Sequence, residues 1–280
     1  MKLANLDLEQ ADSRNVGALC WNRFASIDEK YAGTYLDACE AGDLHTAVCK
    51  MANASLPWGT APDRAIADTI AYRDKSHRDL AKGLGHGSNY LGTPPTMAKQ
   101  SKLPVKIAAE FQKSYFNAFP VIPAWHQSVF DELNRGYLEN LFGFGRHFWG
   151  RPTDAATKRE AVAFKGQSST ATEINIGMLN LWRSNRVQLL IQVHDSILFQ
   201  FPEELEAEII PWALETLKAP LRLAKDRDFV VPTEAKTGWN WGYYDDRNPE
   251  SNPDGLKTWS GSDARKRQHS AGTELSLRLF

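Results

Sequence analysis

The chain has 280 residues and a mass of 31.4 kDa, and its 42% hydrophobic and 24% charged residues are ordinary for a globular protein. Its net charge of −1 and pI near 6.7 supply no global argument for nucleic-acid binding. The apolar runs are too short for a membrane span, the N-terminus has no signal core, and the three cysteines form no CxxC pair. We therefore expect a cytoplasmic protein with no membrane partner and with reduced thiols.

A local excess of positive charge lies between Arg73 and Lys106. This segment contains seven Lys or Arg residues and two Asp residues. Such a bias is typical either of a solvent-exposed helix face or of a surface that lies against phosphates. Composition alone leaves both interpretations open.

The first predicted element is a strand over residues 3–8, where apolar and polar residues alternate as LANLDL. Helical spacing of the apolar residues then predicts mostly helical structure as far as residue 136, with breaks at Pro57 and at the Thr-Pro-Pro of residues 93–95. The predicted helices cover residues 16–24, 45–57, 63–89, 105–119 and 124–136.

The second half of the chain predicts mixed structure. A Gly- and aromatic-rich connection over 142–152 precedes a long helix over 157–182. Two β-rich runs, 189–193 and 196–201, are separated by two residues and therefore predict a hairpin. The remaining predicted elements are a helix over 202–218, a strand over 229–233 and a polar, loosely packed tail over 247–280.

Two aspartates stand at the ends of predicted strands, Asp7 near the end of the first strand and Asp195 at the tip of the hairpin. If these strands are neighbours in one sheet, the two carboxylates converge, and cations between them relieve their repulsion. Mg²⁺ suits this arrangement because it prefers hard oxygen ligands and keeps waters for a substrate phosphate. The alternative is an Asp that occupies a turn for backbone reasons alone.

Arg78, Lys82, His86 and Tyr90 are spaced four residues apart, so on a helix they lie along one face. Two cations followed by two rings predict a nucleotide clamp, in which the cations bind a triphosphate and a ring stacks on the base. The alternative is a cationic stripe that faces solvent and whose last rings pack into the core.

Three segments together resemble the motifs of family A DNA polymerases, the DNA polymerase I type, in the order and at the separations of that family. Motif A is similar to residues 7–14, DLEQADSR; motif B, on the mobile fingers helix, to residues 78–92, RDLAKGLGHGSNYLG; and motif C to residues 192–195, QVHD. Weaker similarities lie at residues 43–45 and 136–143. The resemblance extends from residue 7 to about residue 242 and implies a bacterial or phage-like polymerase.

The resemblance implies an α+β fold, with a palm built on a small antiparallel sheet, a mostly helical fingers subdomain and no thumb. It implies palm at residues 1–44, fingers at 45–165 with the motif B helix near 74–91, palm again at 166–246, and a C-terminal tail at 247–280. The implied activity is template-directed DNA synthesis, in which two Mg²⁺ ions support transfer of a dNMP from a dNTP to the 3′-hydroxyl of a primer–template DNA. The implied location is the cytoplasm of a bacterial or phage-infected cell.

The roles implied by the resemblance fall into three groups. The catalytic metal ligands would be Asp7 and Asp195. The nucleotide-binding residues would be Arg78, Lys82, His86, Tyr90, Gln10, Asp12 and His45. The DNA-binding residues would be Arg14, Arg159, Gln167 and His194.

The motifs depart from the family pattern at four places. Asp12 replaces a Glu that discriminates against the ribose 2′-hydroxyl, and His86 replaces a Phe or Tyr, so we expect altered sugar selection. Leu91 separates Tyr90 from the Gly that usually follows it, and Ser196 replaces the Glu of motif C.

Motif A begins at residue 7, whereas family members have a thumb and the first part of the palm before it. We therefore expect that a separate chain supplies the thumb, or that this chain is a fragment or a decayed copy. The alternative function is a non-catalytic nucleic-acid-binding remnant of a polymerase. A third hypothesis, a metal phosphohydrolase built on His194 and Asp195, requires a helix through that pair.

Overall fold

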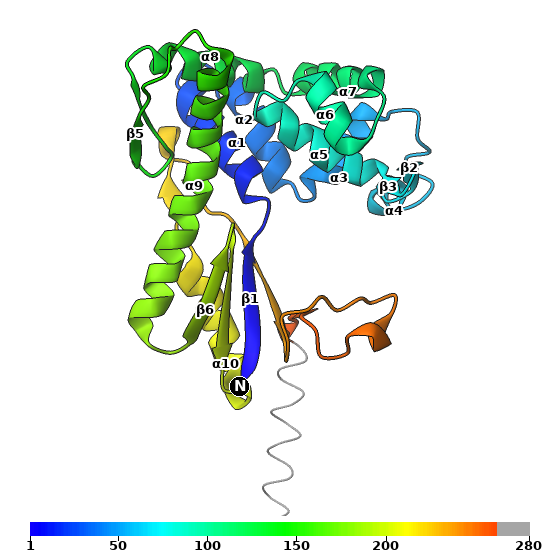
Figure 1. The fold of residues 1–280 in the computed structure, drawn as a ribbon, viewed down its shortest axis with the longest axis vertical. Coiled ribbons are helices and arrows are strands. Elements are labelled where there is room, and N and C mark those ends of the chain that lie inside the picture. Colours follow the sequence, from blue (N-terminus) through cyan, green and yellow to red (C-terminus); the bar gives the residue numbers. More distant parts are fainter. Residues whose placement is uncertain (262–280) are drawn as a thin grey trace, which may run out of the picture. The chain divides into compact units, whose positions relative to one another are not determined.

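The computed structural model describes residues 1–261, which form two compact units (Figure 1). The sheet unit comprises residues 1–11, 170–221 and the described residues from 230 onward, and the helical unit comprises residues 12–169 and 222–229. The combination of helices with antiparallel sheet confirms the predicted α+β fold class. Across residues 1–261, no helix has both the length and the apolar character needed to cross a membrane.

The sheet unit is built on five strands in the order β11-β10-β1-β7-β6, and all neighbours are antiparallel. Residues of β1 alternate between buried and partly exposed, because successive side chains of a strand point to opposite faces. One face of β1 therefore lies in the core, and the other carries Asp7. The strands are β1 (Lys2–Leu8), β6 (Gln188–Val193), β7 (Ser196–Phe201), β10 (Thr233–Gly238) and β11 (Lys257–Thr258).

Two helical segments pack within the sheet unit. The helix α10 (Glu206–Leu217), which follows the short η1 (Glu203–Leu205), buries Ile209 and Ile210. The second half of α9 (Ala155–Ser184) runs so close to the end of α10 that a Cβ at Gly177 would lie 2.5 Å from Leu217 Cδ1. This close approach accounts for a glycine in the middle of a helix, where glycine costs about 1 kcal/mol relative to alanine.

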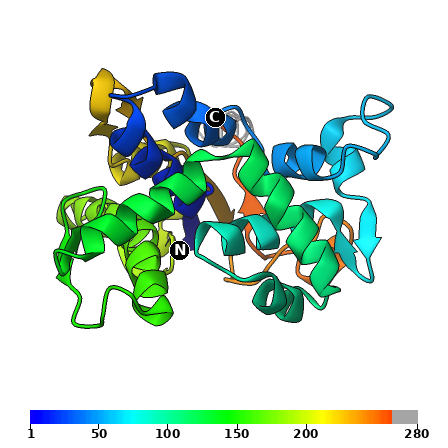
Figure 2. The same ribbon diagram turned by 90° about the horizontal axis from the view of Figure 1, so that it is seen from above.

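The helical unit packs around an aromatic core that includes Tyr35, Tyr115, Phe119 and Trp125. The helices α7 and α8 meet at an angle (Figure 2), because Pro120 disfavours helical conformation in the residue before it. The helices of this unit, besides the first half of α9, are α1 (Ala11–Phe24), α2 (Glu29–Glu40), α3 (Leu44–Ala52), α4 (Asp63–Ala67), α5 (His77–Asn89), α6 (Pro94–Ser101), α7 (Val105–Ala118) and α8 (Val121–Leu133). The short elements are the hairpins β2 (Ile70–Tyr72) with β3 (Lys75–Ser76) and β4 (Tyr137–Glu139) with β5 (Gly145–His147), then β8 (Leu221–Arg222), η2 (Ala224–Asp226) and β9 (Asp228–Phe229).

The single helix predicted over residues 63–89 is wrong, because the β2–β3 hairpin separates α4 from α5. Arg73, between these two strands, has a left-handed φ of +55°. Ser76 then starts α5 through a capping box: its hydroxyl accepts from Asp79 N at 3.0 Å, and the Asp79 carboxylate accepts from Ser76 N at 3.2 Å. The break escaped the pattern because no Gly or Pro marks the turn.

Besides the segment 45–165 that the resemblance implies as fingers, the helical unit contains residues 12–44, 166–169 and 222–229. Val16 and Tyr35, from α1 and α2, are buried in its core. Arg227 binds the carboxylates of Asp37 at 2.6 Å and Glu40 at 2.5 Å. Packing therefore divides the predicted palm segment 1–44 after its first strand.

The last strands also differ from the prediction. The strand expected over 229–233 lies farther along the chain as β10, and part of the expected tail is structured as η3 (Pro249–Ser251) and β11. β11 pairs with β10, and Trp259 N donates to Ala235 O at 2.9 Å. The remainder of the predicted tail, residues 262–280, lies outside the described residues.

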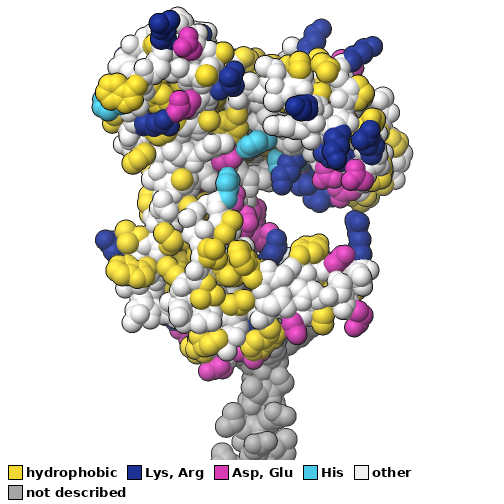
Figure 3. Space-filling view, in the orientation of Figure 1, with side chains coloured by type: hydrophobic (Ala, Val, Ile, Leu, Met, Phe, Trp, Pro, Cys, Tyr) yellow, Lys and Arg dark blue, Asp and Glu magenta, His cyan; other side chains and the backbone are white. Residues whose placement is uncertain are grey.

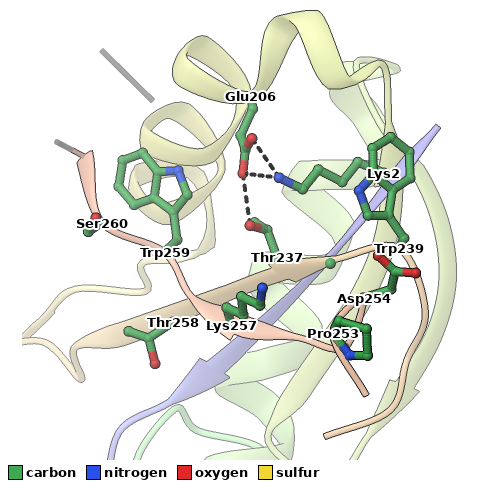
Figure 4. Close-up of a pocket in the computed structure, with 12 residues that line it drawn as sticks. Lys2, Glu206, Thr237, Trp239, Pro253, Asp254, Lys257, Thr258, Trp259 and Ser260 are labelled. Carbon is green, nitrogen blue, oxygen red and sulfur yellow. Dashed lines mark hydrogen bonds and ion pairs between the residues drawn. The ribbon is translucent and has the colours of Figure 1, made fainter. Parts of the chain in front are cut away.

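A buried ion pair ties the first strand of the sheet unit to α10. Lys2 and Glu206 are only 5% and 6% exposed, and Lys2 Nζ donates to the two carboxylate oxygens at 2.9 and 2.8 Å. Thr237 Oγ1 of β10 donates to the same carboxylate at 2.8 Å. These groups line a pocket of about 200 Å³ that has Trp239 and Trp259 on opposite sides (Figure 4). Glu206 therefore joins three elements of the sheet unit.

Candidate functional site

The strand pairing of the sheet unit brings Asp7 and Asp195 onto neighbouring segments. Asp7 lies opposite Ser196, the residue after Asp195, in the β1–β7 pair. The amide N–H of Leu8 donates to the carbonyl oxygen of Asp195 at 3.1 Å. Both aspartates are partly exposed. The condition stated for a converging carboxylate pair, neighbouring strands in one sheet, is therefore met.

Asp195 is held in a two-residue hairpin turn between Val193 and Ser196. His194, the first turn residue, has a φ of +54°, a left-handed conformation that is uncommon for a residue with a side chain. Its Nδ1 lies 3.0 Å from Asp195 Oδ1, and the two side chains are 61% and 27% exposed. Because the pair lies in a hairpin turn, the helix required by the phosphohydrolase hypothesis is absent at His194.

The chemistry of the two carboxylates fits magnesium. A Mg²⁺ ion is bound typically by one or two carboxylates and completes its coordination with water and substrate phosphate oxygens. Among residues 1–261, no three or more His, Cys, Asp and Glu side chains gather in a way that could hold a metal.

The helix α5 forms a second candidate region, within the helical unit. Arg78, Lys82 and His86 occur at helical positions that are partly or fully exposed, and Tyr90 is the C-cap. Because these residues are four positions apart on a helix, they lie along one face of α5, as the sequence predicted. In the space-filling view, Lys and Arg side chains gather beside Asp and Glu over the region of α3, α4 and α5 (Figure 3).

Arg78 is fixed by an aspartate that precedes α3. Its Nε and Nη2 donate to Asp43 Oδ2 and Oδ1 at 2.8 and 2.9 Å. Arg64 also reaches Asp43 Oδ2, at 3.0 Å. Burial opposes ionisation of Asp43, but hydrogen bonds from Arg78 and Thr46 outweigh it and hold the pKa of this carboxyl well below its usual range. Asp43 is a site residue to which the sequence motifs assigned no role.

His45 lies in the same electrostatic environment. Burial, followed by the positive charges of Arg78 and Lys82, lowers the pKa of His45 to about 4. Its imidazole is consequently neutral at pH 7, with one nitrogen able to donate and the other to accept. The predicted nucleotide-binding residues Arg78, Lys82 and His45 are thus close enough to interact within one unit.

Two departures from the family pattern lie next to each other. His86 Nδ1 is 3.9 Å from Asp12 Oδ2, and these side chains are 49% and 13% exposed. The His86 ring also contacts the ring of Tyr90, with 4.9 Å between centroids. The first turn of α1 and the end of α5 therefore place Asp12, His86 and Tyr90 in one contact group.

Tyr90 is positioned by a glycine of α9. Burial, and then the negative charge of Asp12, raise the pKa of the Tyr90 hydroxyl well above its usual value. A Cβ at Gly166 would lie 2.5 Å from the Tyr90 hydroxyl oxygen. Gly166 therefore provides the space in which this ring lies.

A buried network anchors the end of α5 to three other helices. Asn89 Nδ2 donates to the Tyr35 hydroxyl, and the Tyr115 hydroxyl donates to Asn89 Oδ1, each at 2.8 Å. His126 Nε2 lies 2.8 Å from the carbonyl oxygen of Asn89, and with that acceptor it acts as the donor. The partners are 26 to 54 positions from Asn89 in the sequence, so no local pattern could reveal them.

The remaining predicted site residues have different environments. Gln10 lies two residues after the end of β1 and has a φ of +54°. Arg159 and Gln167 are exposed on α9. Arg14 is only 6% exposed, so a direct contact with DNA requires a rearrangement of that side chain.

Comparison with known proteins identifies the family. The model of DNA polymerase family A matches residues 63–243, which is more than half of the chain. The chain therefore belongs to DNA polymerase family A, and the resemblance drawn from the three motifs is confirmed.

Curated relatives agree with this assignment. The chain is 28% identical over 208 residues to the thermostable DNA polymerase I of Thermus thermophilus, a match that covers 71% of this chain and 23% of that protein. It is 28% identical over 178 residues to DNA polymerase I of Treponema pallidum, covering 59% of this chain and 17% of the relative. The matches thus span less than a quarter of the length of these relatives.

The fold is also shared with a solved structure. The POL domain of Pol1 from M. smegmatis, determined in complex with DNA primer-template and dNTP, aligns with a TM-score of 0.64 and 23% identity. The alignment covers 86% of this chain and 40% of that chain. At this identity the likeness establishes a common fold.

Proposed function

We propose that this chain carries out template-directed DNA synthesis, transferring a dNMP from a dNTP to the 3′-hydroxyl of a primer. The observation that carries the proposal is the placement of Asp7 and Asp195 on neighbouring strands of a chain that belongs to DNA polymerase family A. Asp7 and Asp195 would each contribute carboxylate oxygens to two Mg²⁺ ions. Such ions, when bound, activate the attacking hydroxyl and stabilise the departing pyrophosphate.

The chemistry of α5 supports a nucleotide as the substrate. Arg78 and Lys82 would bind the triphosphate, since a guanidinium and an ammonium one helical turn apart neutralise adjacent phosphates. The imidazole of His45, which is neutral at pH 7, would form a hydrogen bond to the nucleotide without contributing a positive charge. Tyr90 would lie beside the nascent base pair.

The contact group of Asp12 and His86 would face the sugar of the incoming nucleotide. Gln10 would also be a nucleotide-binding residue. The DNA strands would be contacted by Arg14, Arg159, Gln167 and His194. The exposure of Arg159, Gln167 and His194 is consistent with this role. Arg14 would have to become accessible when DNA binds.

A primer-extension assay with the full chain, Mg²⁺ and all four dNTPs tests the proposal. Asp7→Asn preserves the shape of the side chain and removes its charge, so extension should fall by at least about 10³-fold, in keeping with the loss of a metal ligand that acts in the transition state. Primer–template binding, followed by fluorescence anisotropy, should change little. The matched control is Asp246→Asn, the same substitution at an exposed position of the sheet unit, which should leave extension unchanged.

The same assay separates the two candidate functions. Salt-sensitive DNA binding without any incorporation, even when a thumb segment is supplied in trans, would establish the non-catalytic remnant instead. Extension that survives Asp7→Asn at the level of the control would refute the assignment of Asp7.

A further inference from the structure

The ion pair between Arg78 and Asp43 has a specific geometry. Asp43 receives the Nε–H and one Nη2–H of Arg78, the side edge of the guanidinium, at 2.8 and 2.9 Å. A guanidinium has five N–H donors. The pairing leaves both Nη1–H groups and the second Nη2–H directed away from Asp43. Three donors of Arg78 thus remain outside this ion pair, in a planar arrangement suited to phosphate oxygens.

Asp43 is itself held rigidly, because it is the N-cap of α3. Its Oδ1 accepts from the amide N–H groups of His45 and Thr46 at 3.2 and 3.3 Å, and Thr46 Oγ1 donates to Oδ2 at 2.8 Å. The side chain is 29% exposed, whereas that of Arg78 is 18% exposed. These hydrogen bonds hold the carboxylate in one position. The two hydrogen bonds from Arg78 to this carboxylate then fix the orientation of the guanidinium.

Arg78 and Asp43 belong to a larger group of charged side chains. Asp43 is shared between Arg78 and Arg64, and Arg64 also binds Asp68 at 2.6 Å. Lys82, one turn after Arg78, is exposed. The cations Arg64, Arg78 and Lys82 are matched in number by the carboxylates Asp43, Asp68 and Asp79, and Asp79 interacts electrostatically with Arg78 and Lys82. Asp43 therefore favours a triphosphate through the orientation it gives Arg78 and not through an excess of positive charge.

We propose that Asp43 is a positioning residue for nucleotide binding: it grips the side edge of Arg78 and presents the remaining N–H groups to the triphosphate. The inference rests on the proposed function, in which Arg78 binds the triphosphate. Its benefit is entropic, because a side chain already held in its binding conformation loses less freedom when the ligand arrives. Asp43 itself does not touch the nucleotide.

Two other roles of Asp43 predict different behaviour. A residue that only caps α3 affects the stability of the helical unit but not nucleotide affinity. A residue that competes with the triphosphate for Arg78 weakens nucleotide binding, so that its removal improves affinity. Asp43→Asn separates these roles, since Asn is as good an N-cap as Asp but loses the charged, two-point grip on Arg78.

The experiment is steady-state primer extension by Asp43→Asn over a range of dNTP concentrations. Immobilising one long side chain accounts for roughly a 2- to 12-fold difference in affinity, so the KM for dNTP should rise by that factor. The kcat should change by less than about twofold, because ground-state and transition-state binding fall together. The matched control is Asp68→Asn, which removes a carboxylate from the same network without touching Arg78 and should leave KM unchanged.

A second comparison ties the effect to Arg78. In an Arg78→Ala background, Asp43→Asn should raise KM no further, since the group that Asp43 orients is gone. An unchanged or lower KM for Asp43→Asn, or a full additional effect in the Arg78→Ala background, would overturn the inference. Absence of incorporation by the unaltered chain, even with a thumb segment supplied in trans, would instead overturn the proposed function, so the two failures are distinguishable.

Discussion

Replacement of Glu206 by Gln tests how the sheet unit is held together. Glu206 is 6% exposed and accepts three hydrogen bonds, two from Lys2 Nζ and one from Thr237 Oγ1, at 2.8 to 2.9 Å. Gln preserves the volume and one acceptor oxygen, but it leaves the ammonium group of Lys2 buried without a counter-charge. The substitution therefore removes one negative charge and leaves the packing volume nearly unchanged.

The expected loss follows from that burial. Removing one partner of a buried ion pair costs about 3–5 kcal/mol, because the other charge stays desolvated, whereas an exposed pair contributes at most about 1 kcal/mol. The same helix offers a control, since Glu208 pairs with Arg186 but its side chain is 63% exposed. Glu208→Gln should therefore change stability by less than about 1 kcal/mol.

Urea denaturation followed by circular dichroism measures the difference. Glu206→Gln should lower the free energy of unfolding by about 3–5 kcal/mol, and adding Lys2→Met should recover about 1–3 kcal/mol of the summed single losses, since the isolated buried charge is then removed. Equal losses for Glu206→Gln and Glu208→Gln would refute the reasoning, as would strict additivity in the double variant.

The remaining predictions concern the helical unit. The pKa of His126 is about 4 in the folded chain, because burial lowers it more than the hydrogen bond to the Asn89 carbonyl raises it. In the unfolded chain the pKa is about 6.5. The contribution of neutral His126 to folding stability is therefore complete above pH 6.5 and is lost as the pH falls toward 4. Between pH 7 and pH 4, the unaltered chain should lose about 3 kcal/mol more stability than His126→Gln, and parallel urea-denaturation profiles for the two would contradict this. Gly166→Ala should destabilise by about 1–3 kcal/mol because its Cβ would strike Tyr90, whereas Gly83→Ala, whose Cβ meets only one atom at 3.9 Å, should be neutral or stabilising by up to about 1 kcal/mol in thermal unfolding. Equal effects of the two glycine substitutions would contradict the close packing of Tyr90.

The elements that sequence predicted well depend on local patterns. Alternation over residues 3–8 predicted β1, and two β-rich runs around two turn residues predicted the β6–β7 hairpin. The four-residue spacing from Arg78 to His86 predicted one face of α5. In each case the spacing of similar residues in the sequence matches the repeat of the backbone, which is two residues in a strand and about 3.6 residues in a helix.

The boundary between the units did not follow from such patterns. Residues 12–44 resemble part of the palm by motif order, but Val16 and Tyr35 join the core of the helical unit. The β2–β3 hairpin interrupts a segment whose composition is helical. Which apolar surfaces meet depends on contacts between distant segments, and these have no local signature.

The sequence by itself identified the family, Asp7 and Asp195 as candidate metal ligands, and the helix with Arg78 and Lys82 on one face. These features depend only on residue identity, order and short-range spacing. Only the tertiary structure decided that Asp7 pairs beside the Asp195 turn, that Asp43 grips Arg78 across 35 positions, and that Asp12 meets His86. The physical reason is that a strand register or an ion pair between distant residues forms only when the intervening chain has folded, so its partners are selected by packing rather than by neighbours in sequence.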